Sequence, residues 1–251
     1  MSNATSIMRK VRHQIRSLIE TYPAFYLPLC RARPKIRQIT VSKSTEIAIE
    51  GYPRSANTFG VAAFTFAKGR QVKNTRHLHA PAHVIAGVRM GVPTLMLIRQ
   101  PEQVVLSLLV HAPHITPKQA LKDYIRFYKS ILPYREGYVV ADFEQVTQNF
   151  GEVIECINNR FETDFKVFEY AEENLTKVFQ IVEEMDKQDT GLRGVQEESI
   201  ARPSRKRERL KMLMQDKLKE SGNSYLPREE QDLYKTFTLG QCQMCSSEGK
   251  G

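Results

Sequence analysis

Residues 46–58, Glu46-Ile-Ala-Ile-Glu-Gly-Tyr-Pro-Arg-Ser-Ala-Asn-Thr58, decide how this chain is expected to fold. The alternating pattern of 46–50 predicts a β-strand, and the Gly, Pro, Ser and Asn that follow it predict a tight turn. An apolar run from Phe59 to Lys68 then predicts a helix. A strand, a turn and a helix in this order place unpaired backbone amides where a phosphate group can bind.

The same alternation continues along the chain. Further strands are expected at 93–98 and 138–142. Helical patterns lie at 83–90, 102–111, 117–132 and 143–160, and fill almost all of the chain after 165. Strands that alternate with helices predict an α/β fold, in which a central parallel sheet carries helices on both faces. The C-terminal part is expected to be helical.

Charge and composition divide the chain into three parts. They are a basic N-terminal extension (1–40), a single domain (41–241) and a flexible tail (242–251). The whole chain of 251 residues carries a net charge of +9. The extension contributes +7 of this charge, with eight basic side chains and one acidic one. A basic amphipathic helix is expected at 6–20, and the prolines at 23, 28 and 34 are expected to break any helix after it.

A basic surface favours polyanionic partners such as nucleic acid, an anionic membrane or a phosphorylated ligand. Because no nucleic-acid-binding motif accompanies the charge, no specific nucleic acid is expected. Residues 6–37 are expected to allow peripheral contact with a membrane surface. The sequence has no apolar stretch of transmembrane length, no secretory signal and only four cysteines. These features favour a cytoplasmic location, with peripheral membrane contact as an addition to it.

The predicted phosphate loop departs from the nucleoside-triphosphate pattern G-x-x-x-x-G-K-[ST] at one decisive position. Asn57 stands before Thr58, where that pattern has the lysine that grips a γ-phosphate, and the cation Arg54 lies three positions earlier. The loop is therefore expected to bind phosphate without acting on a γ-phosphate. A kinase-like or NTPase-like nucleotide-binding protein remains an alternative. A non-catalytic module that binds polyanions is a third possibility.

Four segments resemble the motifs of one enzyme family. Tyr52-Pro-Arg-Ser-Ala-Asn-Thr-Phe59 resembles the loop Y-P-K-S-G-T-T-W of sulfotransferases that use 3′-phosphoadenosine 5′-phosphosulfate. The segment from Leu97 to Ser107 resembles the second motif of that family, His79-Ala-Pro81 its H-x-P segment, and 139–146 its Y-E-D-L stretch. The four occur in the family's order and cover about residues 46–150. The resemblance implies a P-loop sulfotransferase with a strand–loop–helix phosphate site.

The resemblance also implies which residues bind the cofactor. They are Pro53, Arg54, Ser55, Ala56, Asn57, Thr58, Phe59, Arg99, Ser107 and Phe143. Arg54 replaces the lysine of the family and is expected to stabilise the leaving oxygen, because arginine keeps its proton. Arg99 and Ser107 are expected to hold the 3′-phosphate. Phe59 and Phe143 replace a tryptophan and a tyrosine, and Phe59 is expected to offer its ring to adenine.

The C-terminal glycine-rich segment of the family has no clear counterpart here. Its role is assigned to the basic run Arg205-Lys-Arg207 after Pro203-Ser204, and within it to Arg205 and Lys206. No metal is expected to take part. Cys242 and Cys245 have the C-x-x-C spacing but no second pair of ligands, so two ordinary thiols are expected.

The expected catalytic base is His79, because the H-x-P segment of the family carries the catalytic histidine. Spacing alone does not separate His79 from His77 and His83. The expected reaction moves a sulfuryl group to a hydroxyl or amine of an acceptor, with 3′-phosphoadenosine 5′-phosphate as the other product. The acceptor is left open between a small molecule, a carbohydrate and a glycolipid.

Overall fold

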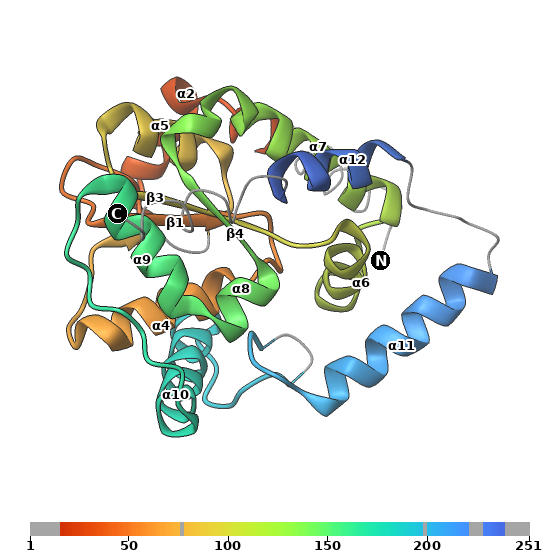
Figure 1. Ribbon diagram of the computed structural model, residues 1–251. Helices are drawn as coiled ribbons and strands as arrows, with labels where there is room; N and C mark the ends of the chain where they lie inside the picture. The colour runs from red at the N-terminus through yellow and green to blue at the C-terminus, as the bar shows by residue number, and fades with distance from the viewer. Residues whose placement is uncertain (1–15, 76–77, 198–199, 221–227, 239–251) are drawn as a thin grey trace, which may run out of the picture.

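The computed structural model describes residues 16–75, 78–197, 200–220 and 228–238 (Figure 1). These residues are built around a four-stranded sheet with the strand order β2-β1-β3-β4. The strands are β1 (Ile47–Gly51), β2 (Asn74–Thr75), β3 (Thr94–Ile98) and β4 (Val139–Asp142). All three pairs of neighbouring strands are parallel. The predicted α/β class with a central parallel sheet is therefore confirmed, and the two-residue edge strand β2 is an element that the sequence pattern did not predict.

Helices connect and follow the strands. They are α2 (Pro23–Arg31), α3 (Pro34–Arg37), α4 (Asn57–Lys68), α5 (Pro81–Met90), α6 (Pro101–His111), α7 (Pro117–Ile131), α8 (Phe143–Gln148), α9 (Phe150–Phe161), α10 (Glu172–Thr190), α11 (Arg205–Glu220) and α12 (Arg228–Thr238), with a 3-10 turn at Leu132–Gly137. The single helix predicted at 143–160 is two helices, because Asn149 between them leaves the helical conformation with φ −144°. None of the described helices is long and apolar enough to cross a membrane.

The central strand β3 supplies both halves of the core. Leu95 and Leu97 contact the apolar cluster of α4, α9 and α10, while Met96 and Ile98 contact the cluster of α6, α7 and α12. All four side chains are fully buried. A strand buried on both faces has a continuous apolar sequence, which is why this segment lacks polar alternation. Helices thus cover both faces of the sheet, with α4 and α10 below it and α5 and α7 above it in Figure 1.

The prediction that three prolines break any helix is wrong. α2 begins at Pro23 and contains Pro28, and α3 begins at Pro34. Proline in the first turn costs no hydrogen bond, and its fixed φ suits a helix. Pro28 withholds a donor from the carbonyl of Ala24, but both residues are exposed, so water can solvate that carbonyl.

The N-terminal helices pack on the domain. Leu27 of α2 shares a buried cluster with Ala48 of β1 and Ala86 of α5. Tyr26 and Cys30 contact the start of α5 in a second cluster. Residues 16–40 are therefore part of the folded body. The first part of the helix expected at 6–20 and the tail expected at 242–251, with its two cysteines, lie outside the described residues.

Candidate functional site

Three of the candidate residues have a strained backbone. Arg54 and Ala56, in the loop between β1 and α4, have φ values of 73° and 70°, and His79 beside this loop has φ 48°. Among the described residues other than glycine only one more, Glu162 at the end of α9, has a positive φ. Such conformations cost roughly 1–3 kcal/mol each and concentrate at functional sites. The strain therefore marks the end of β1 as a candidate site.

Buried contacts fix the shape of this loop. A side chain at Gly51 would place its Cβ 2.4 Å from the carbonyl oxygen of Leu97, so only glycine fits there. The phenol of Tyr52 donates to the carbonyl of Ala120 at 3.0 Å. Asn57 Nδ2 donates to the carbonyl of Tyr52 at 3.2 Å. The side chain of Asn57 is therefore turned back into the loop, and it is buried together with that of Ser55.

The loop leads into the N-terminus of α4. Its N-cap residue Ala56 has no side chain that can cap the helix, and the first intrahelical bond runs from the amide of Gly60 to the carbonyl of Ala56. The amides of the first turn have no partner within an α-helix. Together with the helix dipole they attract an anion. Thr58, in this turn, and Pro53, in the loop, are both half-buried.

Four predicted site residues from separate segments meet above this loop. Arg54 Nε donates to Ser107 Oγ of α6 at 3.0 Å, and Arg99 Nη1 donates to the carbonyl of Arg54 at 3.2 Å. The guanidinium of Arg99 lies over the ring of Phe143, 3.7 Å from its centroid. Arg99 Nε is buried and makes no hydrogen bond. The loop, the end of β3, α6 and α8 thus contribute to one site.

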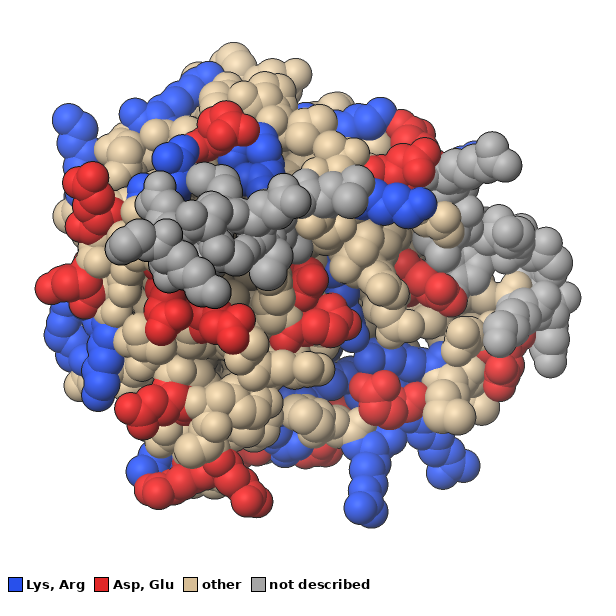
Figure 2. All heavy atoms as spheres, in the orientation of Figure 1, with Lys and Arg blue, Asp and Glu red and all other residues tan. Residues whose placement is uncertain are grey.

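The helix α11 contributes two buried cations, Arg207 and Lys211. Arg207 belongs to the basic run predicted from the sequence, but neither residue was among the expected ligands. Arg207 and Lys211 are 9% and 8% exposed, whereas the predicted ligands Arg205 and Lys206 lie on the exposed side of this helix. α11 packs on α6, and Figure 2 shows Lys and Arg side chains gathered at the lower right, where α11 lies in Figure 1. The structure therefore brings a different pair of α11 residues towards the site.

The environment of these two cations leaves donors available. Arg207 donates to the carbonyl of Ile200, and its Nε makes no hydrogen bond although it is buried. Its nearest carboxylate is Glu208 Oε1, 3.8 Å from Nε. Lys211 Nζ lies 2.9 Å from the same oxygen. One carboxylate is thus shared between two cations.

We refer to Arg54, Arg99, Arg207 and Lys211 as the cationic cluster. Burial, followed by repulsion from Arg207 and Arg99, lowers the pKa of Arg54 to about 10. Burial is also the main reason why the pKa values of Arg99, Arg207 and Lys211 are lowered. Removing like charges from water together is unfavourable unless anions compensate them. The cluster is therefore suited to a ligand with several negative charges.

The ring of His79 is oriented by the loop. Its Nδ1 lies 3.0 Å from the carbonyl oxygen of Gly51. A carbonyl can only accept, so Nδ1 carries the proton of the neutral ring and Nε2 carries the lone pair. This is the tautomer that a general base needs.

A pocket of about 200 Å³ adjoins His79. Its walls include apolar side chains of three helices or their flanking loops, namely Leu78, Leu108, Ile115 and Phe127. Charged groups also line it: Glu20, paired with Arg16, and Asp123, paired with Arg126. The pocket can hold a small molecule or one sugar unit with its hydroxyls near the histidine.

The other two candidate histidines differ from His79. His77 lies outside the described residues. His83 is fully buried, its Nδ1 accepts the N–H of Val41 at 3.2 Å, and its ring packs edge-on against Tyr26. Burial, and then the nearby Arg31, lower its pKa to about 3. Such a group stays neutral near pH 7 and serves as part of the core.

The expectation that Phe59 offers its ring to adenine finds no support in the structure. The ring is buried and lies 6.1 Å, centroid to centroid, from that of Phe179 of α10. α10 packs on α4 here, so this face of the helix belongs to the core. Phe143, by contrast, is only half-buried and borders Arg99.

Glu50 is a further residue that the sequence analysis did not select. It is fully buried at the end of β1, beside Thr75 and the backbone of His79, and burial raises its pKa to about 8. Its carboxyl group is therefore protonated at neutral pH. The signal available in the sequence is an acid that directly precedes the glycine of the loop.

Among the residues that the structure describes, no group of three or more His, Cys, Asp or Glu side chains could hold a metal ion. Comparison of the sequence with protein-family models and with curated proteins finds no match. The functional argument therefore depends on the geometry and chemistry of the site.

Proposed function

We propose that this chain is a sulfotransferase that moves a sulfuryl group from 3′-phosphoadenosine 5′-phosphosulfate to a hydroxyl or amine of an acceptor. The observation that carries the proposal is the meeting of Arg54, Arg99 and Ser107 at the loop after β1. These residues come from two separate sequence motifs. A single nucleotide with phosphates at two positions would need both motifs to lie side by side, and these hydrogen bonds join the two motifs.

The donors of the site fit the cofactor. The amides of the first turn of α4 and the side chain of Arg54 would hold the 5′-phosphosulfate group, within the phosphate loop of the proposed family. Arg99, Ser107 and Arg207 would hold the 3′-phosphate. The Nε atoms of both Arg99 and Arg207 are buried without a hydrogen bond. The hydroxyl of Ser107 accepts from Arg54 Nε and still has its own proton to donate.

The chain's own groups match the needs of sulfuryl transfer. The bound donor would supply a sulfuryl group whose bond to the 5′-phosphate oxygen breaks as a bond to the acceptor forms. Negative charge grows on that phosphate oxygen, and Arg54 with the α4 amides would stabilise it. With a pKa of about 10, Arg54 stays charged at neutral pH and acts electrostatically. Nε2 of His79 would take the proton of the acceptor.

The pocket beside His79 would receive the acceptor. Its apolar walls and paired charges suit a molecule with both apolar and hydroxyl-bearing parts. A small molecule, a sugar or the head of a glycolipid meets this description.

Calorimetric titration of the purified chain tests the proposal. The ligands are 3′-phosphoadenosine 5′-phosphate, adenosine 5′-phosphate and ATP, each with and without magnesium. We expect binding of the bisphosphate that needs no magnesium and exceeds that of both other nucleotides. Magnesium-dependent ATP binding would favour a kinase-like protein instead. Equal binding of all three that disappears with added salt would favour a polyanion-binding module.

A further inference from the structure

The first described helices present an exposed apolar face. Leu18, Tyr22, Phe25 and Leu29 are 53%, 57%, 68% and 52% exposed. Phe25 and Leu29 lie one turn apart on α2 and share one face of it. Tyr22 is the N-cap residue of this helix, and Leu18 lies in the helical stretch 16–19 that a turn separates from α2. The rings of Tyr22 and Phe25 meet edge to face, with centroids 6.5 Å apart. Eight large apolar side chains are exposed in the described part of the chain, and these four of them lie within residues 18–29. An exposed apolar patch of this kind marks a surface that binds a partner.

The charge next to this apolar face has one sign. Residues 21–45 contain five Lys and Arg and no Asp or Glu. All five are exposed, and four of them follow the apolar residues directly: Arg31, Arg33, Lys35 and Arg37. At the top of the molecule, where α2 lies in Figure 1, Figure 2 shows uncharged side chains next to Lys and Arg.

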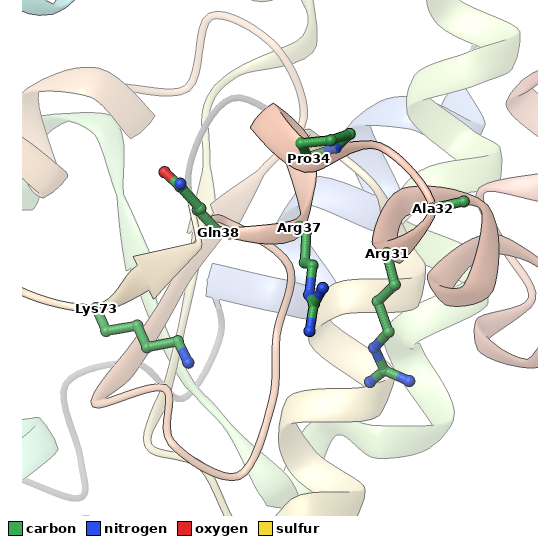
Figure 3. A pocket seen from close by; sticks show the side chains of 6 residues that line it. All are labelled: Arg31, Ala32, Pro34, Arg37, Gln38 and Lys73. Atoms are coloured by element: carbon green, nitrogen blue, oxygen red, sulfur yellow. The ribbon is translucent and has the colours of Figure 1, made fainter.

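An open recess lies beside these cations. It has a volume of about 730 Å³ and is lined by Arg31, Arg37 and Lys73, together with Ala32, Pro34 and Gln38. Figure 3 shows Arg31 and Arg37 extending side by side into this space, with Lys73 reaching towards it from the opposite side. Arg31 also donates to the carbonyl of Val41 at 3.4 Å. None of the described side chains that line the recess is acidic, so the recess is suited to an anionic group.

We propose that this surface docks on an anionic lipid bilayer. It consists of Leu18, Tyr22, Phe25, Leu29, Arg31, Arg33, Lys35 and Arg37, and we call it the N-terminal face. Aromatic and aliphatic side chains enter the boundary between headgroups and acyl chains, while Lys and Arg contact the headgroup phosphates. The recess provides space for such a headgroup.

Other partners match the N-terminal face less well. Nucleic-acid-binding surfaces combine cations with aromatic rings on which bases stack. The two rings here, Tyr22 and Phe25, pack edge to face against each other, and the aliphatic Leu18 and Leu29 add exposed area on which no base stacks. The absence of acids between residues 21 and 45 complements a uniformly negative surface better than the mixed charges of a protein partner.

The N-terminal face adjoins the pocket beside His79. Arg16, Ser17 and Glu20 precede or alternate with its apolar residues and line that pocket. Ser17 Oγ donates to Asp123 Oδ1 at 3.0 Å, which joins the segment to α7. If the proposed function holds, docking would bring the pocket to the lipid surface, and a glycolipid would be the favoured acceptor. The docking itself does not depend on that function.

Sedimentation of the whole chain with vesicles tests the docking. Vesicles of phosphatidylcholine alone are compared with vesicles that also contain phosphatidylserine. We expect binding only to the anionic vesicles, and we expect added salt to weaken it. Equal binding to both kinds of vesicle, or binding to neither, would overturn the proposal. So would stronger binding of an RNA oligonucleotide than of anionic vesicles at the same salt concentration.

Two pairs of substitutions locate the contact. Phe25→Ser with Leu29→Ser, and separately Arg33→Gln with Lys35→Gln, should each weaken vesicle binding at least about tenfold. Matched controls outside the N-terminal face are Leu192→Ser with Met212→Ser, and Lys118→Gln with Lys122→Gln, all at exposed positions. Controls that weaken binding as much as the test pairs would contradict this surface. Displacement of the vesicles by soluble glycerophosphoserine would show that the apolar residues are not used.

The sequence also permits a direct optical test, because the chain contains no tryptophan. Phe25→Trp places a single indole on the N-terminal face, and Met212→Trp places one on α11. We expect a blue shift of the Phe25→Trp emission with anionic vesicles and no shift for Met212→Trp. Unchanged emission of Phe25→Trp on vesicles that bind the protein would place the contact elsewhere.

Discussion

Arg54 Nε donates a 3.0 Å hydrogen bond to Ser107 Oγ, a residue 53 positions further along the chain. The bond joins the loop after β1 to the second turn of α6. Arg99, at the end of β3, adds a bond to the carbonyl of Arg54. Because buried like charges repel each other, this arrangement is most stable when an anion lies among them. The first two predictions follow from that requirement.

Arg54→Ala should weaken the binding of 3′-phosphoadenosine 5′-phosphate by about ten- to a hundredfold. A hydrogen bond to a charged group contributes roughly 1.5–3 kcal/mol, which corresponds to that range. Arg54→Lys keeps the charge but loses the planar fork, so its loss should be smaller. Calorimetry measures the three dissociation constants, with Lys118→Ala as a surface control. An unchanged constant for Arg54→Ala would remove this residue from the site.

Arg207→Ala should also weaken bisphosphate binding about tenfold or more, whereas Arg205→Ala on the same helix should leave it unchanged. Arg207 is buried near Arg54 and Arg99, and Arg205 is exposed. The loss should be much smaller for adenosine 5′-phosphate, because Arg207 is assigned to the 3′-phosphate. Equal effects of the two substitutions would mean that α11 contributes only general positive charge.

His79→Ala should abolish sulfuryl transfer while bisphosphate binding stays within about twofold, because the loss of a general base affects the chemical step. His111→Ala is the matched control. His111 lies near Arg54, and burial is the main cause of its lowered pKa, but it does not line the pocket beside His79. Turnover is followed with labelled donor and a panel of hydroxyl acceptors. Loss of turnover in His111→Ala but not in His79→Ala would reassign the base.

The order of the central elements could be predicted from the sequence because each has its own signal. Thr94–Ile98 is a short apolar run of strand length, and Thr116-Pro117 marks the start of α7. The two-residue strand β2 is too short to show a period. The sequence pattern did not predict α2 because proline within a segment indicates a helix break, yet two of the three prolines in this stretch, Pro23 and Pro34, lie where a helix starts.

The sequence motifs could predict that Arg54, Arg99 and Ser107 belong to the candidate site, but they could not predict which residues α11 contributes. The sequence pattern points to the basic run Arg205-Lys-Arg207 and, within it, to Arg205 and Lys206. Packing selects a helical face instead: Arg207, Lys211, Met214 and Leu218 follow one another at spacings of four, three and four residues. Met214 and Leu218 contact the core cluster of α6 and α7, which turns Arg207 and Lys211 towards α6. The helical period of the whole segment is therefore the signal that could have found them.

Ala56→Gly should stabilise the fold by about 0.5–1 kcal/mol. Ala56 has φ 70°, a conformation that glycine adopts without strain. The same substitution at Ala63, in the interior of α4, should destabilise the fold by about 1 kcal/mol. Urea unfolding of both variants measures these opposite signs. Destabilisation by Ala56→Gly would mean that the left-handed conformation carries no strain in solution.

Glu50→Gln should change how stability depends on pH. The folded pKa of Glu50, about 8, lies above that of an exposed glutamate. The folded state therefore holds a proton that the unfolded state has lost, and the wild-type chain loses stability as pH rises between about 5 and 8. The slope due to this one group is on the order of 1 kcal/mol per pH unit. Glutamine cannot ionise, so the variant should become more stable relative to wild type as pH rises through this range.

Urea unfolding of both proteins across the same pH range measures this difference. Glu46→Gln is the matched control on the same segment. Glu46 pairs with Arg70 at the surface, and the hydrogen bond from Arg70 lowers its pKa. The contribution of Glu46 is therefore lost only in acid, and the Glu46→Gln profile should run parallel to wild type above about pH 5. A Glu50→Gln profile that also runs parallel to wild type would mean that Glu50 is ionised and hydrated in the folded chain.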